Sequence, residues 1–369
     1  MNSYQKALDE RKKQHLLRTL PLPPDGIDFY SNDYLGLAKS SELELAIKSA
    51  LEQGLKQNGA TGSRLLSGNS EYAEHVEQLI ADFHMSESAL IYSSGYTANL
   101  GLISCLATRE TTLYCDELIH ASLIDGARLG HSKRIRFSHN DPSDLDKKLK
   151  EHSGQKIVIV ESIYSMDGDI CPLNDIVEIC LENGAQLIVD EAHSMAVRGE
   201  KGNGFVQELG LQDQVLARIM TYGKGPGIHG AAVVGPKWLK DYQVNFSRSM
   251  IFSTAPAAHQ FCAIEAMYQL LPEIDFEREK LQSNISYFVE KRNKTNSSWL
   301  NSQSQIQSLI IPGNEQVVEL GKKLCAAGIN ALPIRKPSIA EGSERIRFCL
   351  HSFNTKDEID LLFKVLNNE

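Results

Sequence analysis

The segment Leu187-Ile-Val-Asp190-Glu-Ala-His193-Ser194 carries the pattern that decides the fold, since a short apolar run ends abruptly in polar side chains. Runs that are apolar throughout, rather than alternating, are typical of strands buried on both faces of a mostly parallel sheet. Six further runs of this kind lie between about residue 70 and residue 235, separated by helix-length segments. They are Ala89–Tyr92, Leu113–Cys115, Ile135–Phe137, Ile157–Val160, Arg218–Met220 and Ala231–Val234. We therefore expect an α/β fold with a mostly parallel, seven-stranded sheet between layers of helices.

The N-terminal segment predicts a helical arm and then a second helix. The apolar residues of the arm, which have the spacing of one helix face, are Tyr4, Ala7, Leu8, Leu16 and Leu17. Prolines at 21, 23 and 24 prevent this helix from continuing. Ser41 and Glu44 form a candidate capping box for the second helix. Its expected apolar face is Leu43, Ile47, Ala50, Leu51 and Leu55.

The segment after the sheet predicts a long helix and then a smaller α+β unit. Residues 257 to about 294 are expected to be helical throughout and to link two domains. The smaller unit is expected to contain a strand Ile306–Ile311, a helix Val317–Ala327, strands near Asn330–Ile334 and Arg345–Leu350, and a closing helix Lys356–Leu366. The predicted domains are an arm with a substrate-side segment (1–40), a large α/β domain (41–272) and a small C-terminal α+β domain (273–369).

Composition argues against several classes of protein. The 369 residues include 38 Lys and Arg against 47 Asp and Glu, a net charge of −9, so no basic face is available for nucleic acid. No apolar stretch reaches the roughly 18 residues that cross a bilayer, and the N-terminus is charged where a signal peptide is apolar. We therefore expect a cytoplasmic protein that binds neither nucleic acid nor membrane. The seven cysteines show no C-x-x-C pair, so no disulfide framework and no metal site is predicted.

Polar residues that follow the apolar runs are the candidates for function, because ligands of such sheets collect at the carboxyl ends of the strands. The loop Ser93-Ser-Gly95-Tyr96-Thr-Ala-Asn99 follows the first run and opens a helix, whose N-terminal N–H groups can bind an anion. Gly95 would let a phosphate approach closely. A turn without any ligand is an equally good interpretation of this loop taken alone.

Asp190 and His193 place an acid and an imidazole three residues apart at the same edge of the sheet. A buried Asp there needs a cationic partner, and a protonated heterocycle would serve. A metal site is the competing interpretation, but no third ligand lies nearby at the usual spacing.

Lys224 lies among glycines in Met220-Thr221-Tyr-Gly-Lys224-Gly-Pro-Gly227, where nothing buries the stem of a lysine. A lysine in a constricted loop, partly removed from water, can act as a nucleophilic amine. A phosphate-binding P-loop lysine is the alternative, but the G-x-x-x-x-G-K-[ST] spacing is absent. We therefore interpret Lys224 as a lysine that forms a Schiff base.

These three elements, in this order along the chain, resemble those of the pyridoxal 5′-phosphate (PLP)-dependent α-oxoamine synthases, a family of fold type I. Further segments match the family in its own order over almost the whole chain. They are Phe29–Leu37 (FYSNDYLGL), Gly59–Arg64 (GATGSR), Asp116–Ser122 (DELIHAS), Ser165–Asp169 (SMDGD) and Arg345–Arg347 (RIR). The resemblance implies a PLP-dependent acyltransferase.

The resemblance implies a role for four catalytic residues around the cofactor. Lys224 would hold PLP covalently and remove the α-proton of the amino acid, while Asp190 would pair with the ring nitrogen. His120 would stack on the ring, and His193 would hydrogen-bond the ring hydroxyl oxygen. The other implied cofactor contacts are Gly95, Tyr96, Ser165, Thr221, Ser253 and Thr254. The last two match a segment that reaches the phosphate of the neighbouring subunit, which implies a homodimer with shared active sites.

The implied reaction is a decarboxylating condensation of an amino acid with an acyl thioester. The expected substrates are L-alanine and a pimeloyl thioester, as in biotin biosynthesis. Arg347 would bind the amino-acid carboxylate. Arg345 is the alternative, since alternate residues of a strand face opposite sides. Arg18 would contact the acyl substrate, and Asn32 lies in the family's substrate-side motif.

The sequence leaves the choice of substrate open. Glycine C-acetyltransferase, 5-aminolevulinate synthase and serine palmitoyltransferase use the same constellation, and one methyl group in a pocket is worth only about 1–3 kcal/mol. The acyl carrier, coenzyme A or a carrier protein, is open as well. More distant alternatives are an aminotransferase or carbon–sulfur lyase on the same fold, and a binding protein that has kept the fold without the cofactor.

Overall fold

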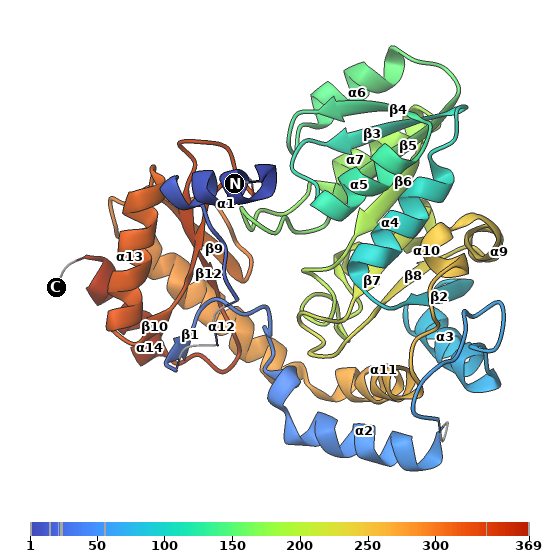
Figure 1. Cartoon of the computed structure of the whole chain (residues 1–369), viewed down its shortest axis with the longest axis horizontal. Helices are drawn as coiled ribbons and strands as arrows, with labels where there is room; N and C mark the ends of the chain where they lie inside the picture. The colour runs from blue at the N-terminus through green and yellow to red at the C-terminus, as the bar shows by residue number, and fades with distance from the viewer. Residues whose placement is uncertain are drawn as a thin grey trace. The chain divides into compact units, whose positions relative to one another are not determined.

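The computed structural model describes residues 2–14, 16–20, 22, 25–54, 57–336 and 338–367, which form two compact units. The large unit comprises Leu35–Tyr164 and Ile170–Arg278, and the small unit comprises Met1–Tyr34, Ser165–Asp169 and Glu279–Glu369. Figure 1 shows both units with their helices and strands. Leu55 and the three prolines expected to end the N-terminal helix lie outside the described residues.

The large unit is built on a seven-stranded sheet in the order β2-β8-β7-β6-β5-β3-β4. Six strands run parallel, and β8 is antiparallel to both of its neighbours. Every predicted strand is confirmed, with each end extended by at most two residues. The strands are β2 (Ser88–Tyr92), β3 (Thr111–Asp116), β4 (Lys133–Phe137), β5 (Gln155–Glu161), β6 (Gln186–Asp190), β7 (Ala217–Thr221) and β8 (Ala231–Gly235).

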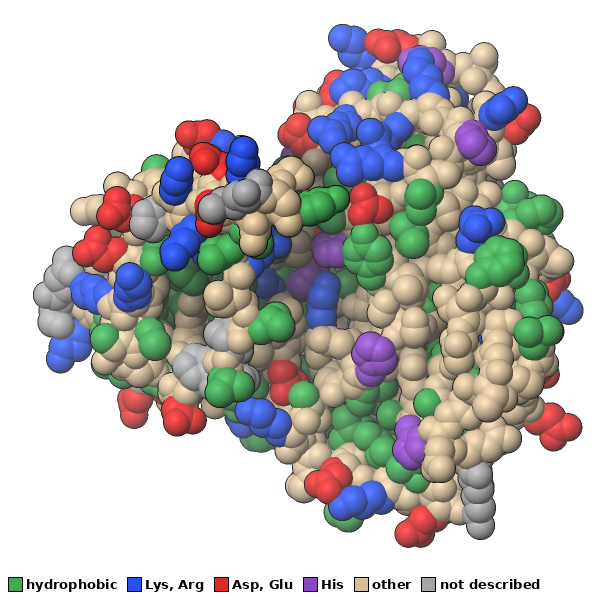
Figure 2. All heavy atoms as spheres, viewed as in Figure 1, with side chains coloured by type: hydrophobic (Ala, Val, Ile, Leu, Met, Phe, Trp, Pro, Cys, Tyr) green, Lys and Arg blue, Asp and Glu red, His purple; other side chains and the backbone are tan. Residues whose placement is uncertain are grey.

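The outer strand β4 corrects one premise of the sequence argument, namely that all seven strands are buried on both faces. Lys133, Arg134 and Arg136 are exposed, because β4 pairs only with β3 and forms an edge of the sheet. Figure 2 shows Lys and Arg side chains gathered over this part of the large unit. Charges on an edge strand hinder pairing with a second sheet, so they suit this position.

Helices cover both faces of the sheet, as expected (Figure 1). α4 (Gly95–Leu106) packs against α5 (Ala121–Leu129) on one face, and α6 (Pro142–Lys150) packs against α7 (Leu173–Glu182) on the other. Right-handed crossovers between parallel strands require this division, since the chain reverses its direction across the sheet at the edge strand β4. The inward residues of the strands and of these helices form one apolar core.

Further helices complete the large unit. They are η1 (Leu37–Lys39), α2 (Ser41–Gln53), α3 (Glu71–Phe83), α8 (Phe205–Glu208), η2 (Gln212–Gln214), α9 (Lys237–Phe246), α10 (Arg248–Ile251), α11 (Ala258–Leu270) and η3 (Leu271–Glu273). The helix predicted to run unbroken from residue 257 is interrupted at η3, which contains Pro272, a residue that lacks an N–H and disfavours helix in the residue before it. The chain becomes helical again in α12 (Asp275–Arg292).

The cap of α2 lies one residue earlier than predicted. Ser40, rather than Ser41, has the extended backbone of an N-cap residue, and its hydroxyl accepts a hydrogen bond from the Leu43 N–H at 3.1 Å. The third residue of the helix is then Leu43, which cannot complete a capping box. Glu44 lies in the first turn, where a negative charge favours the helix.

The small unit contains two short sheets and confirms the predicted C-terminal elements. β11 (Leu332–Ile334), β12 (Arg345–Cys349) and β9 (Ile306–Ile310) form an antiparallel sheet in that order, while β1 (Ile27–Asp28) pairs in parallel with β10 (Ile329–Asn330). The helices α13 (Asn314–Ala326) and α14 (Lys356–Leu366) lie where the periodicity predicts them. The pairing of β1 with β10 explains why the first 34 residues cluster with the C-terminal part rather than forming a domain of residues 1–40.

The N-terminal helix α1 (Ser3–Lys13) is shorter than predicted, and none of its eleven described residues is buried. Leu16 and Leu17 follow it as irregular chain. Tyr4 is 81% exposed and Leu8 55% exposed, so the apolar spacing of the arm does not mark a face buried within this chain.

The segment Ser165–Asp169, which we call the strap, belongs to the small unit although the large unit surrounds it in the sequence. Asp167 Oδ1 pairs with Arg345 Nη1 at 2.6 Å. The carbonyl of Met166 accepts from the Ser308 hydroxyl at 2.7 Å, and the carbonyl of Gly168 accepts from Ser302 at 2.8 Å. Gly168 has φ +75°, and an added Cβ would meet the Ile306 carbonyl oxygen at 2.1 Å. The boundaries predicted at 40/41 and 272/273 miss the strap, because its partners are more than 130 residues away in the sequence.

The charged composition of the helices has one further consequence. Among the described residues, no helix is both long enough and apolar enough to span a membrane.

The position of the α2 cap gives a testable prediction. S40A should weaken the first turn of α2 by about 1 kcal/mol, because it removes the acceptor of the Leu43 N–H. The matched variant S41A should change it by less than about 0.5 kcal/mol. Amide hydrogen exchange of the peptide that covers Ser41–Leu45 measures the difference, and S40A should speed it about fivefold. A larger effect of S41A than of S40A on the exchange rate would show that Ser41 is the cap.

Candidate active site

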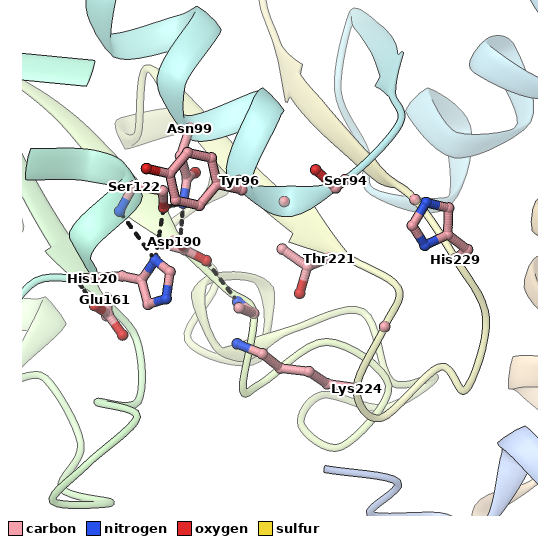
Figure 3. Close-up of a pocket in the computed structure, with 14 residues that line it drawn as sticks. Ser94, Tyr96, Asn99, His120, Ser122, Glu161, Asp190, Thr221, Lys224 and His229 are labelled. Carbon is pink, nitrogen blue, oxygen red and sulfur yellow. Dashed lines mark hydrogen bonds between the residues drawn. The ribbon is translucent and has the colours of Figure 1, made fainter. Parts of the chain in front are cut away.

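A cavity of about 200 Å³ opens in the large unit at the carboxyl ends of the parallel strands (Figure 3). Strand ends of a parallel sheet meet at one edge, so residues far apart in the sequence converge there. The lining residues are Ser94, Gly95, Tyr96, Asn99, His120, Ser122, Glu161, Asp190, Ala192, Thr221, Gly223, Lys224, His229 and Gly230. Three loops predicted from the sequence, those of Gly95, Asp190 and Lys224, thus contribute to a single cavity.

Lys224 lies in the tight loop between β7 and β8, and its Nζ is 2.8 Å from His193 Nε2. Close packing explains the glycines of the loop. An added Cβ at Gly225 would lie 2.7 Å from the Met195 carbonyl oxygen, and one at Gly227, which has φ +71°, would lie 2.4 Å from the Ala38 nitrogen. The loop therefore holds the lysine stem at the cavity, as the sequence argument expects for a nucleophilic amine.

Asp190 ends β6 and is 4% exposed. Oδ2 accepts from Asn99 Nδ2 at 2.7 Å, and Oδ1 accepts from the Ala192 N–H at 2.9 Å. Two neutral donors fix the direction of this carboxylate without neutralising its charge. A buried carboxylate in such a setting is suited to a cationic ligand.

His120 is the N-cap residue of α5 and lies beside Asp190 in the cavity wall (Figure 3). Its Nδ1 is 2.7 Å from the Ser122 hydroxyl and accepts from the Ser122 N–H at 3.2 Å. Burial lowers the pKa of this imidazole and Lys224 lowers it further, while Asp190 opposes the change. A neutral ring fixed at Nδ1 presents a flat apolar face, which suits stacking on an aromatic ligand.

Glu161 is a buried carboxyl group that the sequence argument overlooks. It ends β5, accepts a hydrogen bond from the His120 backbone N–H, and lies opposite Asp190 in the register of β5 and β6. Burial, followed by the charge of Asp190, raises the pKa of Glu161 to about 8. A signal was available, because Glu161 directly follows the predicted strand Ile157–Val160 just as Asp190 follows Leu187–Val189.

The N-terminus of α4 forms the other end of the cavity. Ser94 caps the helix, and its hydroxyl accepts from the Thr97 N–H at 3.2 Å. A Cβ added at Gly95 would meet Thr221 Cγ2 at 2.5 Å, so the first residue of the helix must be glycine to let Thr221 approach. Thr221 is 7% exposed, and its Oγ1 has no hydrogen-bond partner among the described residues. Free helix N–H groups and an unsatisfied hydroxyl together suit an anion such as phosphate.

Three predicted contacts of the large unit, His193, Ser253 and Thr254, do not line the cavity. Ser253 and Thr254 follow α10 and are exposed, so in this chain alone they do not reach the cavity wall. Tyr96 lines the cavity and its hydroxyl donates to Asp125 at 2.5 Å.

Asn99 and Ser122, which also line the cavity, lie within predicted motifs, but neither has a predicted role. His229 is a further lining residue with no predicted role.

The remaining predicted site residues lie in the small unit. Arg347 is 5% exposed, and its Nη2 donates to Asn32 Oδ1 at 2.7 Å. Its Nε has no hydrogen-bond partner among the described residues. Arg345 is instead engaged with Asp167 of the strap, to which Ser165 also belongs. Arg18 Nη2 lies 3.4 Å from the Ser338 hydroxyl.

The residues around the cavity fit PLP. An amine on Lys224, a buried carboxylate held by neutral donors at Asp190 and an unsatisfied hydroxyl at the helix N-terminus correspond to the aldehyde, ring nitrogen and phosphate of that cofactor. Among the residues described, no group of three or more His, Cys, Asp or Glu side chains could hold a metal ion.

Comparison with known proteins agrees with this chemistry. The family model of aminotransferase class I and II matches residues 24–366. The chain is 36% identical to an 8-amino-7-oxononanoate synthase of Emericella nidulans, over 99% of this chain and 94% of that protein. It is 37% identical to an 8-amino-7-oxononanoate synthase of Marinobacter nauticus, over 99% and 96% of the two chains.

Two solved structures are similar over nearly the whole chain. A serine palmitoyltransferase from S. paucimobilis with a bound PLP–myriocin aldimine gives a TM-score of 0.91 at 27% identity, covering 100% of this chain and 98% of that one. The 8-amino-7-oxononanoate synthase from Francisella tularensis gives a TM-score of 0.80 at 28% identity, covering 93% and 97%. The chain belongs to the aminotransferase class I and II family and, within it, to the α-oxoamine synthases, transferases whose cofactor is PLP.

Proposed function

We propose that this enzyme condenses L-alanine with a pimeloyl thioester and releases 8-amino-7-oxononanoate, CO2 and the free thiol. A bond forms between the alanine α-carbon and the acyl carbonyl carbon, the carbon–sulfur bond breaks, and the alanine carboxylate leaves as CO2. The observation that carries the proposal is the convergence of Lys224, Asp190 and His120 on one cavity. The names of the relatives at 36% and 37% identity support this pair of substrates.

The cofactor, when bound, withdraws electrons from the amino-acid α-carbon and so makes its proton removable. Lys224 binds the cofactor through Nζ and later accepts the α-proton on the same atom. Asp190, held by Asn99 and Ala192, keeps a negative charge against the ring nitrogen and holds a proton there. His193, 2.8 Å from Lys224 Nζ, orients the amine and would hold the hydroxyl group of the cofactor ring through a hydrogen bond.

His120 stacks on the cofactor ring, and Gly95, Tyr96 and Thr221 hold the phosphate at the start of α4. Ser165 of the strap is a further cofactor contact. Ser253 and Thr254, which are exposed in this chain, serve the cavity of a neighbouring copy, so the enzyme is a homodimer with shared active sites.

Substrate recognition falls to the small unit in this proposal. Arg347 binds the amino-acid carboxylate until it leaves as CO2, and Asn32 holds the guanidinium group in place. The pairing of Arg345 with Asp167, and its Nε, which donates to the Ser343 carbonyl at 3.0 Å, favour Arg347 over Arg345 for this role. Arg18 contacts the acyl chain.

A second candidate is a sister reaction with another amino acid and acyl chain. The TM-score of 0.91 to a serine palmitoyltransferase favours it, since the whole framework is shared. The backbone alone does not separate glycine, alanine and serine, whose side chains on the α-carbon are only a hydrogen, a methyl group and a hydroxymethyl group.

Glu161 contributes to the charge balance of the cavity. With its pKa raised to about 8, it is protonated near neutral pH and adds no second negative charge beside Asp190. Because Glu161 is neutral, Asp190 is the carboxylate that favours a cationic ring in the cavity.

The proposed reaction can be tested directly with the holoenzyme. Incubation with L-alanine and pimeloyl-coenzyme A or a pimeloyl carrier protein should release CO2 and give the amino ketone, whereas glycine and L-serine should give far less. Mass spectrometry of the product and trapping of labelled CO2 measure this outcome. K224A should lose covalent PLP, seen by mass spectrometry after borohydride reduction, and all turnover. A preference for serine with a long acyl chain would establish the sister reaction instead.

Variants of the two arginines test the assignment of the carboxylate site. R347K should raise the KM for the amino acid at least about tenfold, because an ammonium group cannot replace a bidentate guanidinium contact. R345K should leave this KM within about threefold and should instead lower the thermal unfolding midpoint, since it disturbs the buried pair with Asp167. Steady-state kinetics and thermal unfolding give the two values. The reverse pattern would move the carboxylate site to Arg345.

The shifted Glu161 predicts a pH dependence of stability. Between roughly pH 5 and pH 8 the folded protein holds a proton that the unfolded chain has lost, so the free energy of unfolding should fall as pH rises through this window. E161Q removes the titrating group and should reduce the fall. Thermal unfolding of the PLP-free protein at pH 5.5 and pH 8 measures it, with the exposed Glu182 as the E182Q control. An unchanged fall in E161Q would show that Glu161 titrates normally.

A further inference from the structure

His229 is the lining residue that the proposed chemistry leaves without a role. It lies in the loop between Lys224 and β8 and is exposed at the mouth of the cavity. In Figure 3 it lies beyond Thr221, on the side of Ser94, whereas Asp190 and His120 lie on the other side. It therefore belongs to the end of the cavity that α4 forms.

The backbone on both sides of His229 is fixed. The Tyr222 N–H donates to the Gly230 carbonyl at 3.0 Å, and the Ile228 N–H donates to the Tyr222 carbonyl at 2.9 Å. Gly230 has φ +118°, a backbone conformation that L side chains rarely adopt, so a larger residue there would strain the loop. Because the backbone on both sides of His229 is fixed, the side chain of His229 starts from a defined position at the cavity.

The surroundings of His229 are those of an anion site. The N-terminus of α4, a helix of 12 residues, presents its N–H groups, and Thr221, whose methyl group packs against Gly95, is 7% exposed and has an Oγ1 without a hydrogen-bond partner among the described residues. The two carboxyl groups that line the cavity, Asp190 and Glu161, lie at its other end (Figure 3). An anion beside α4 thus meets donors and positive partial charge without a competing carboxylate in the cavity wall.

We propose that His229 is a phosphate-binding residue, whose imidazole donates a hydrogen bond to the cofactor phosphate seated at the start of α4. Thr221 and the helix N–H groups hold the inner oxygens, and His229 covers the side that faces solvent. The inference rests on the proposed placement of the phosphate at α4, and it adds a donor that neither the motifs nor the comparisons assign. His229 binds the phosphate and takes no part in the proton transfers of Lys224.

A pair of ligands that differ only in the phosphate tests this role. The full-length protein, stripped of PLP, is titrated with PLP and with pyridoxal, and the two Kd values are compared by absorbance and calorimetry. H229A should weaken PLP about tenfold, the value of one charge-assisted hydrogen bond, and change pyridoxal less than twofold. H229Q, which keeps a donor of similar reach, should recover part of the loss. The control H131N changes an exposed histidine outside the cavity and should alter neither Kd.

The variant T221A distinguishes a failure of the role proposed for His229 from a failure of the proposed phosphate placement at α4. If T221A weakens PLP selectively and H229A does not, the phosphate lies at α4 and the role of His229 is refuted. If both variants weaken PLP and pyridoxal equally, the phosphate does not lie at α4, and both placements fail. A selective loss in both variants, with partial recovery in H229Q, supports the proposal. Thermal unfolding of each variant confirms that the titrated protein is folded.

Discussion

The site depends on one electrostatic constraint, the burial of the Asp190 carboxylate, whose hydrogen bonds among the described residues come from neutral donors. Asn99 and the Ala192 N–H orient this group but leave its charge intact. Burial, followed by the charge of Asp190, raises the pKa of the neighbouring carboxyl group of Glu161, which is therefore neutral near pH 7. A ligand that brings its own positive charge, such as a protonated pyridine ring, relieves the cost of that burial.

Much of the fold is predictable because the buried strands of a parallel sheet are short runs of apolar residues in the sequence. All seven strands and the C-terminal elements were found in this way. The errors come where neighbours, not local sequence, decide the structure. The apolar pattern of β4 does not reveal that it is an edge strand, and the choice between Ser40 and Ser41 as the cap of α2 depends on one residue of register. The arm helix was overextended because apolar spacing alone does not show whether a partner surface exists.

The candidate site was predictable to a similar degree and for a related reason. Asp190, Gly95 and Thr221 directly follow predicted strands or open the next helix, and Lys224 lies in the loop after one, so topology brings them to one edge, whereas His120 was predicted from the family resemblance. Glu161 was missed because a single acid after a strand has no distinctive neighbours. The resemblance names Arg347 as the carboxylate ligand, with Arg345 as the alternative, and the structure adds one difference between them, the pairing of Arg345 with Asp167. Ser253 and Thr254 lie away from the cavity of their own chain, and their role stays a prediction.

The strap imposes an order on the maturation of this chain during synthesis. Its anchoring partners, Ser302, Ser308 and Arg345, are translated long after the strands β5 and β6 that flank it. A ribosome that has completed the entire sheet of the large unit has still not made the residues that fasten residues 165–169. Residues 165–169 therefore remain without these partners until the last part of the polypeptide emerges, and a message truncated before codon 302 yields a sheet whose β5–β6 crossover carries a strap without its anchors.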